Sequence, residues 1–254
     1  MATYRNVLKE KLAAGQFTRG LWVTLEAATI TEIAVELGFD WVVIDAEHGH
    51  LDFKALLEHI RATRGSETTP LVRIAEIQQG LIKRVLDIGA AGIIVPQVTG
   101  AEEVARAVRF AKYPPQGIRG VGGERATGWS MHLAEATAGA NDRTLVIPLI
   151  ETVEAYQSLD QIMSVPGVDA LFIGPADLSA SAGHLGQWEG PGVAEMVLAI
   201  KDRAAARGLA CGVMAKSVDN ARQRRDQGFR LLGVASDTGL IIRGAKESLA
   251  ALDR

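Results

Sequence analysis

The sequence predicts an α/β protein built as a single (β/α)8 barrel, or TIM barrel, with one helix before the first strand. The chain has 254 residues, of which 48% are apolar, and one barrel commonly occupies this length. Short apolar runs alternate with longer segments of helical periodicity, which indicates βα units and parallel strands. Eight such runs are present. We therefore expect one barrel domain over residues 1–254.

The expected elements follow one another in regular alternation. A charged amphipathic helix over about residues 4–14 comes first. The apolar runs are rich in Val, Ile and Leu, as strands buried on both faces require. The predicted strands are residues 20–25, 41–45, 70–74, 92–96, 145–151, 170–174, 210–214 and 231–235. Amphipathic helices are expected in segments such as 29–38, 51–63 and 80–90, where apolar residues recur at three and four. A doubly wound open sheet is the structural alternative.

One connection, residues 113–143, is too long for a plain turn between two elements. It contains two prolines and six glycines, and loops of this length are usually functional or disordered. Its RGVGGERATG core lacks the lysine and serine or threonine of a phosphate-binding P-loop. We interpret the segment as a mobile lid over the active site.

Composition excludes several classes of partner. The 27 Lys and Arg residues against 30 Asp and Glu residues give a net charge of -3, so no broad basic surface for nucleic acid or anionic lipid is expected. No apolar run is long enough for a membrane span, and the amino terminus lacks a signal-peptide core. The single cysteine, Cys211, excludes an intrachain disulfide and fits a cytoplasmic location, with the thiol in the core.

Polar residues at the carboxyl ends of the strands are the candidates for function, because the active site of a TIM barrel lies there. Glu151 and Asp177 follow neighbouring strands and suit a hard, oxygen-ligated ion such as Mg2+ or Mn2+, with Co2+ or Zn2+ as possible substitutes. The competing interpretation is that both carboxylates stabilise the starts of helices. Spacing alone does not choose between the two.

His48 and His50 follow the second strand, and Arg73 lies inside the third. A histidine near carboxylates can accept and return a proton near neutral pH, although the pair could also bind metal or cap a helix. Arg73 cannot lose its charge, so it must face an anion, and an enolate oxygen is a suitable one.

Lysine is absent from the positions that an amine-based aldolase needs. Lys54, Lys83, Lys112 and Lys201 all fall in predicted helices, and only Lys216 follows a strand. A Schiff-base mechanism is therefore disfavoured, and a metal must polarise the substrate ketone.

These residues together resemble the HpcH/HpaI family of class II pyruvate aldolases, and the likeness runs nearly end to end. It is carried by GFDWVVIDAEHGHLD, PLVRIAE, LIKRVLDIGAAGIIVPQV, YPPQGIRGVG, IPLIETVEA and VDALFIGPADLSASAG. The resemblance implies a metal-dependent carbon-carbon lyase that releases pyruvate, or hydroxypyruvate, and an aldehyde from a 4-hydroxy-2-oxo acid. Keto acid and aldehyde are then its small-molecule partners. It also implies a homo-oligomer, a hexamer built of trimers or dimers.

The resemblance assigns roles residue by residue. Glu151 and Asp177 would ligate the metal, and Arg73 would hold the ketone oxygen as it becomes an enolate. His48, oriented by Asp87, would transfer protons, and Asp45 would support the water network. The substrate would be bound by the residues around a helix start and by two pocket residues, namely Gly174, Pro175, Ala176 and Asp177, with Trp22 and Val213.

Two alternatives and one departure accompany this assignment. A decarboxylase acting on oxaloacetate would use the same metal, arginine and enolate. A non-catalytic barrel that binds a keto acid would need an output domain, which the sequence does not contain. Leu149 stands where relatives often have glutamine, which affects the detailed substrate contacts.

Overall fold

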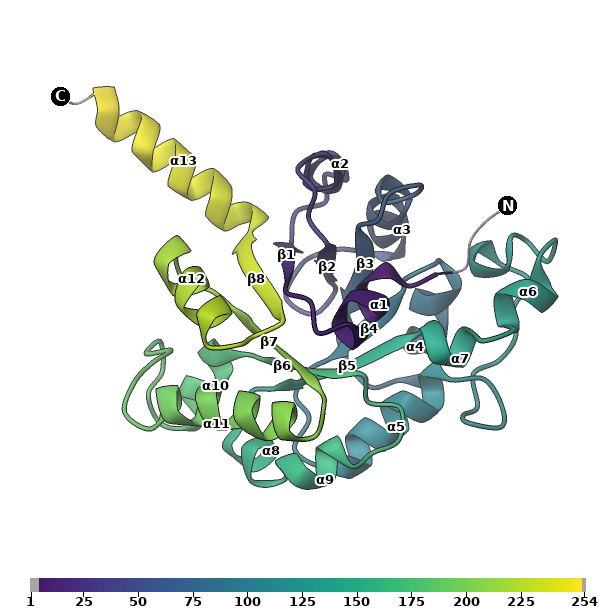
Figure 1. Cartoon of the computed structure of the whole chain (residues 1–254). Coiled ribbons are helices and arrows are strands. Elements are labelled where there is room, and N and C mark those ends of the chain that lie inside the picture. The colour runs from purple at the N-terminus through teal and green to yellow at the C-terminus, as the bar shows by residue number, and fades with distance from the viewer. Residues whose placement is uncertain (1–4, 253–254) are drawn as a thin grey trace.

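Eight parallel strands close into one barrel in the computed structural model, which describes residues 5–252 (Figure 1). Each strand pairs with the next along the chain, and β1 pairs with β8 to complete the closure. The strands are β1 Thr18–Val23, β2 Trp41–Asp45, β3 Thr69–Arg73, β4 Gly92–Val95, β5 Leu145–Ile150, β6 Ala170–Ile173, β7 Ala210–Met214 and β8 Leu231–Ser236. The prediction of a TIM barrel with a preceding helix is confirmed.

Helices separate the strands, as the sequence periodicity predicts. They are α1 Val7–Ala13, α2 Thr29–Glu36, α3 Phe53–Ala62, α4 Gln79–Asp87, α5 Ala101–Ala111, α6 Leu133–Thr137, α7 Ala140–Arg143, α8 Val153–Gln157, α9 Leu159–Met163, α10 Pro175–Ser181, α11 Val193–Ala206, α12 Val218–Asp226 and α13 Asp237–Leu252, with a short 3-10 helix, η1, at Arg125–Thr127. Part of the predicted first helix lies outside the described residues. No helix of the described part of the chain is long and apolar enough to cross a membrane.

The side chains of each strand alternate between two buried layers. One layer fills the barrel interior and includes Trp22, Trp41 and Phe172, whereas the other lies between the strands and the helices. Trp41 is fully buried and fits because Gly20 faces it: a Cβ at that position would lie 2.1 Å from the indole ring. Cys211 belongs to the outer layer, and burial raises the pKa of its thiol far above the usual value, so the predicted core role is confirmed.

Helix α1 covers the amino-terminal end of the barrel. Leu8 is fully buried against the interior layer. The side chain of Asn6 caps the helix by accepting from the amide of Lys9, and it donates to the carbonyls of Ala91 and Arg143 at 3.1 and 2.7 Å. These contacts fasten the helix to the segments that enter β4 and β5.

The long connection between α5 and β5 lies at this same amino-terminal end, so it does not cover the mouth of its own barrel. Its residues line a pocket together with Asn6 and Ala91. The interpretation as a lid over the chain's own active site is corrected for a topological reason. A helix that follows a parallel strand runs back toward the strand's start, so the segment after it begins at the end opposite the active site.

Helix α13 extends away from the barrel instead of packing along it (Figure 1). Its first residue, Asp237, is buried and accepts from the amides of Thr24 and Leu25, both at 2.9 Å. From residue 241 to the last described residue, every position is exposed. The helix is thus anchored only at its start.

Candidate active site

The alternation of side chains along the strands brings the candidate residues to one place. In β2, β3 and β5, the residues of the interior layer are Trp41, Val43, Leu71, Leu145, Ile147 and Leu149. A period of two then directs Asp45, Arg73 and Glu151 toward the barrel axis at the carboxyl end. These three charged residues are buried, with exposed fractions of 1%, 8% and 3%.

Arg73 is held by two carboxylates of its own chain. Its Nε donates to Asp45 Oδ1 at 2.9 Å, and Nη2 donates to Asp45 Oδ2 in a bidentate pair. Nη1 forms an ion pair with Glu47 Oε2 at 2.9 Å, and the guanidinium lies 5.0 Å from the centre of the Trp22 ring. Trp22 Nε1 donates to Asp45 Oδ2 at 3.1 Å. The prediction that Arg73 faces an anion is met here by Asp45 and Glu47.

Glu47 and Gln97 belong to the same network, although the sequence reasoning did not select them. Gln97 Nε2 donates to Glu47 Oε1 at 3.1 Å, and the backbone amide of Gln97 donates to Glu151 Oε1 at 2.6 Å. Gln97 has φ 53°, an uncommon value for a residue with a side chain, and such backbone strain is often found at functional sites. Both residues come just after a strand, which is the signal that identified the others.

Glu151 is the carboxylate with the strongly perturbed titration. Burial raises its pKa to about 7; the amide of Gln97 opposes the rise, whereas the charges of Glu47 and Asp177 add to it. Gly174 leaves room for the carboxylate, because a Cβ there would lie 2.8 Å from Glu151 Oε2. The neighbouring carboxylates of Glu47 and Asp177 therefore add to the negative charge around the buried Glu151.

Asp177 lies in the first turn of α10, directly after the end of β6. Pro175 is the first residue of this helix, and its fixed φ suits that position. The first-turn amides of a helix have no partner within it, so those of Ala176 and Asp177 are available to oxygen atoms beside Glu151. The predicted substrate segment 174–177 and the predicted metal pair thus share one edge of the barrel mouth.

His48 also lies at the mouth, but its predicted partner does not. The backbone amide of His48 donates to Asp45 Oδ1 at 3.2 Å, whereas its imidazole makes no hydrogen bond within residues 5–252. Asp87 is the last residue of α4, a helix that has returned toward the amino end of the barrel. Its carboxylate accepts from Arg119 Nη2 at 2.8 Å. One chain does not bring His48 and Asp87 together.

Val213 is not part of the mouth either. It belongs to the layer between strands and helices, and the interior-facing residue at this end of β7 is Met214. The assignment of Val213 to the aldehyde pocket is therefore corrected, because the alternation along β7 turns its side chain outward. Trp22, in contrast, lies in the interior layer beside Arg73, as expected.

The donors present suit a hard cation better than a soft one. Glu151 and Asp177 offer carboxylate oxygens, which Mg2+ and Mn2+ prefer, and Cys211 is turned away from the mouth. Within residues 5–252, no group of three or more His, Cys, Asp or Glu side chains is arranged to hold a metal. Two protein carboxylates leave further coordination positions for water and substrate oxygens, as Mg2+ sites commonly do.

The fold and the mouth together define the class, a (β/α)8-barrel enzyme with buried acid and arginine groups at the carboxyl ends of its strands. The chain belongs to the HpcH/HpaI aldolase/citrate lyase family, whose model matches residues 18–244. It is an enzyme of the aldolase class.

Relatives agree over almost the full chain. A hydroxypyruvate/pyruvate aldolase from Paraburkholderia phytofirmans is 37% identical over 98% of this chain and 98% of its own. A 5-keto-4-deoxy-D-glucarate aldolase from Salmonella arizonae is 36% identical over 97% and 96%. The solved structure of a family member from Burkholderia cenocepacia superposes with a TM-score of 0.94 at 33% identity, covering 98% of this chain and all of that one.

Proposed function

We infer that this single barrel domain catalyses reversible aldol cleavage of a 4-hydroxy-2-oxo acid to an aldehyde and pyruvate or hydroxypyruvate, with a divalent metal. The observation that carries the proposal is the buried Glu151, whose pKa of about 7 reflects burial and the neighbouring charges of Glu47 and Asp177. A divalent cation would relieve that excess negative charge. The names of the relatives support the choice of substrate class.

Glu151 and Asp177 would hold the cation, with Mg2+ or Mn2+ favoured and Co2+ or Zn2+ as possible substitutes. When bound, the metal would polarise the ketone of a chelated 2-oxo acid. This would lower the pKa of the C–H bond next to the ketone. Lys216, the one lysine expected after a strand, forms an ion pair with Glu189 at 2.5 Å.

Arg73 would stabilise the enolate oxygen. A guanidinium has five N–H donors, and three of its nitrogens already contact Asp45 or Glu47. The second N–H of each terminal nitrogen remains for a substrate oxygen. Asp45 thus positions Arg73, and the Trp22 ring covers the guanidinium on one side. Trp22 and the segment Gly174 to Asp177 would complete the substrate pocket.

His48 would accept and return protons at the reacting carbon or hydroxyl group. Its imidazole needs an orienting partner, and the resemblance assigns that role to Asp87. Because Asp87 lies toward the other end of its own barrel, we infer that it reaches His48 from a second copy of the chain. A homo-oligomer, with a hexamer as the expected state, would place the α4 end of one copy at the mouth of the next.

Pyruvate release from a series of 4-hydroxy-2-oxo acids, coupled to lactate dehydrogenase, tests the function. We expect release that EDTA abolishes and that Mg2+, Mn2+ or Co2+ restores. Oxaloacetate in the same assay reports any decarboxylase activity. Full activity in excess EDTA, or a borohydride-trapped adduct on a lysine, would contradict the metal-dependent assignment.

A further inference from the structure

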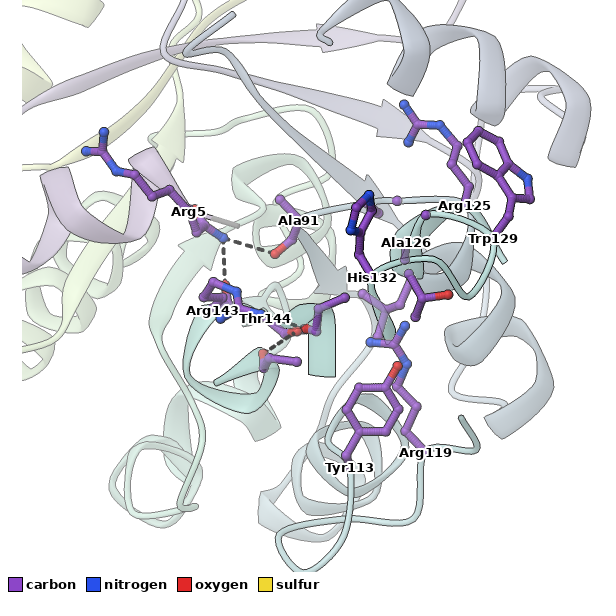
Figure 2. A pocket seen from close by; sticks show the side chains of 18 of the residues that line it. Arg5, Ala91, Tyr113, Arg119, Arg125, Ala126, Trp129, His132, Arg143 and Thr144 are labelled. Carbon is purple, nitrogen blue, oxygen red and sulfur yellow. Dashed lines mark hydrogen bonds between the residues drawn. The ribbon is translucent and has the colours of Figure 1, made fainter. Parts of the chain in front are cut away.

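A pocket of about 420 Å3 opens at the amino-terminal end of the barrel, opposite the proposed active site (Figure 2). It is formed by the connection of residues 113–144 on one side and, on the other, by Arg5, Asn6, Arg64 and residues 86–91 before β4. Its volume lies in the range of small-molecule sites. The catalytic residues proposed above do not line it.

The charges around this pocket are one-sided. Five arginines and a histidine line it, and no aspartate or glutamate is among the described lining residues, although carboxylates outside the lining pair with Arg5, Arg119 and His132. These cationic residues are Arg5, Arg64, Arg119, Arg125, Arg143 and His132. A hollow lined by charges of one sign attracts ions of the opposite sign.

Two of the arginines lack carboxylate partners. Arg125 Nη1 donates to the carbonyl of Ile88 at 2.9 Å, and burial together with the charges of Arg64 and Arg61 holds its pKa below the usual value. Arg64 is exposed, and its side chain forms no hydrogen bond or ion pair within residues 5–252. The positive charges crowd one another, which an anion between them would relieve.

Arg119 provides a second, independent indication of a ligand. It is 5% exposed, and although Nη2 donates to Asp87, its Nε has no hydrogen-bond partner within the described chain. Leaving a buried charged donor unpaired is costly. The guanidinium lies 4.6 Å from the centre of the Tyr113 ring. Figure 2 shows Arg119 with Tyr113 on one side of the pocket and Arg125 with Trp129 on another, with His132 between them.

The backbone of the pocket wall is held in an unusual conformation. Gly128, Trp129 and Ser130 have φ values of 60°, 55° and 69°, three consecutive left-handed residues of which two carry side chains. Such strain persists only when surrounding contacts enforce it, and it gathers at binding sites. Trp129 is 58% exposed at the pocket rim. The wall therefore presents an indole beside the arginines instead of burying it.

We propose that this pocket binds a small multivalent oxyanion, a di- or tricarboxylate or a phosphate, at a site separate from the mouth of its own barrel. Arginine forks match the paired oxygens of both chemistries, and the Tyr113 and Trp129 rings would contact the body of an organic anion. A bound anion would stabilise the folded protein and fasten the 113–144 connection to the barrel.

Titration of the purified, metal-loaded enzyme with tricarballylate and, separately, with inorganic phosphate tests the proposal. The readouts are Trp129 fluorescence, with Trp129→Phe as the silent reference, and isothermal titration calorimetry. We expect saturable binding of at least one anion. Arg64→Ala and Arg125→Ala should each weaken it about tenfold, as loss of one charged hydrogen-bonding group does.

The matched control is Arg222→Ala, which removes an exposed arginine on α12 that forms an ion pair with Asp219 and does not line this pocket. It should bind as the wild type does. Because Arg64 is exposed, its replacement should leave folding intact even if Arg125→Ala does not. Tighter phosphate than tricarballylate binding would identify a phosphate ligand, and the reverse a carboxylate ligand.

Three outcomes would overturn the proposal. The first is no saturable binding of either anion. The second is binding that Arg64→Ala leaves unchanged but Arg73→Ala removes, which would place the anion in the active site. The third is that neither anion changes Trp129 fluorescence and that Arg64→Ala dissociates the oligomer, as measured by light scattering. That result would mean that a second copy fills the pocket.

Discussion

Two buried carboxylates at the barrel mouth, Asp45 and Glu151, have pKa values that are shifted in opposite directions. Burial alone would raise the pKa of Asp45, but the hydrogen bonds and charge of Arg73, with the Trp22 N–H, hold it below its usual value. Glu151 is also buried, but the hydrogen bond from the Gln97 amide and the charge of Arg73 do not offset its burial and the acidic neighbours Glu47 and Asp177. Asp45 is thus paired with Arg73 within the protein, whereas a bound cation would be needed to balance the charge of Glu151.

The raised pKa of Glu151 predicts how the stability of the metal-free enzyme depends on pH. A carboxyl group whose folded pKa exceeds its unfolded value favours the folded state below the unfolded pKa, and this contribution is lost as pH rises through the folded pKa. For Glu151 the window runs from 4.5 to about 7. Wild type should therefore lose roughly 3 kcal/mol relative to Glu151→Gln across it.

Urea unfolding in EDTA at a series of pH values measures this difference. Glu154→Gln, on the adjacent helix α8, serves as the control because its glutamate lies outside the site. Parallel stability curves for wild type and Glu151→Gln would show that Glu151 titrates as an ordinary carboxylate.

Arg73 should be intolerant of the conservative change to lysine. Lysine keeps the charge but cannot form the bidentate pair with Asp45 and a contact with Glu47 while donating to substrate. We expect turnover to fall about 10^2-fold or more, the scale of one lost oxyanion donor. Steady-state kinetics check this against Arg222→Lys, an exposed arginine on α12. Near wild-type turnover would assign Arg73 a structural role.

His48 and His50 lie in one loop and provide a test with an internal control. If His48 transfers protons, His48→Ala should slow both aldol cleavage and exchange of pyruvate methyl protons with deuterated water, because both reactions pass through the enolate. The expected loss is about 10^2 to 10^4-fold, whereas His50→Ala should remain near wild type. If the rate of proton exchange in His48→Ala stays within a few fold of wild type, another group must act as the base.

At the scale of elements, the sequence allowed the strands to be predicted well because burial on both faces leaves an uninterrupted apolar run. The predicted bounds of residues 41–45 and 210–214 are those of β2 and β7, and the other strands differ by one or two residues. The search for charged residues at the ends of predicted strands likewise selected Arg73 and Glu151. Glu47 and Gln97 also follow strands but were not selected, because their contacts with Arg73 and Glu151 depend on where neighbouring loops meet, which strand periodicity does not encode.

Helix α13 exposes apolar side chains that the rest of the described chain does not cover. Ile241, Ile242, Leu249 and Leu252 are 57%, 54%, 64% and 84% exposed along it. An apolar helix surface of this kind usually packs against another surface. We expect that surface to belong to a second copy, so Leu249→Glu should shift the enzyme to a smaller assembly in light scattering. Leu185→Glu, which changes a more exposed leucine elsewhere, should not.

At the scale of the whole molecule, the two ends of the barrel carry different parts of the proposed machinery. The carboxyl end holds Arg73, Glu151 and His48, and the amino end holds Asp87 with its partner Arg119. The family resemblance paired His48 with Asp87 but did not indicate that they lie apart in one chain. That separation follows from the direction of α4, and it makes the proposed pair dependent on assembly.

Mixing inactive variants tests whether neighbouring copies share a site. His48→Ala and Asp87→Asn should each be impaired alone, but coassembly from equal amounts should restore about a quarter of the sites, since each site then draws one residue from each chain in a closed, symmetric oligomer. A mixture of His48→Ala with Arg73→Lys should restore nothing, because both residues belong to the mouth of one chain. Activity measured after joint refolding, with thermal melting of each variant to confirm folding, distinguishes the two mixtures. If both mixtures stay inactive while Asp87→Asn is folded, Asp87 does not act on a neighbour's His48, and its ion pair with Arg119 would be structural.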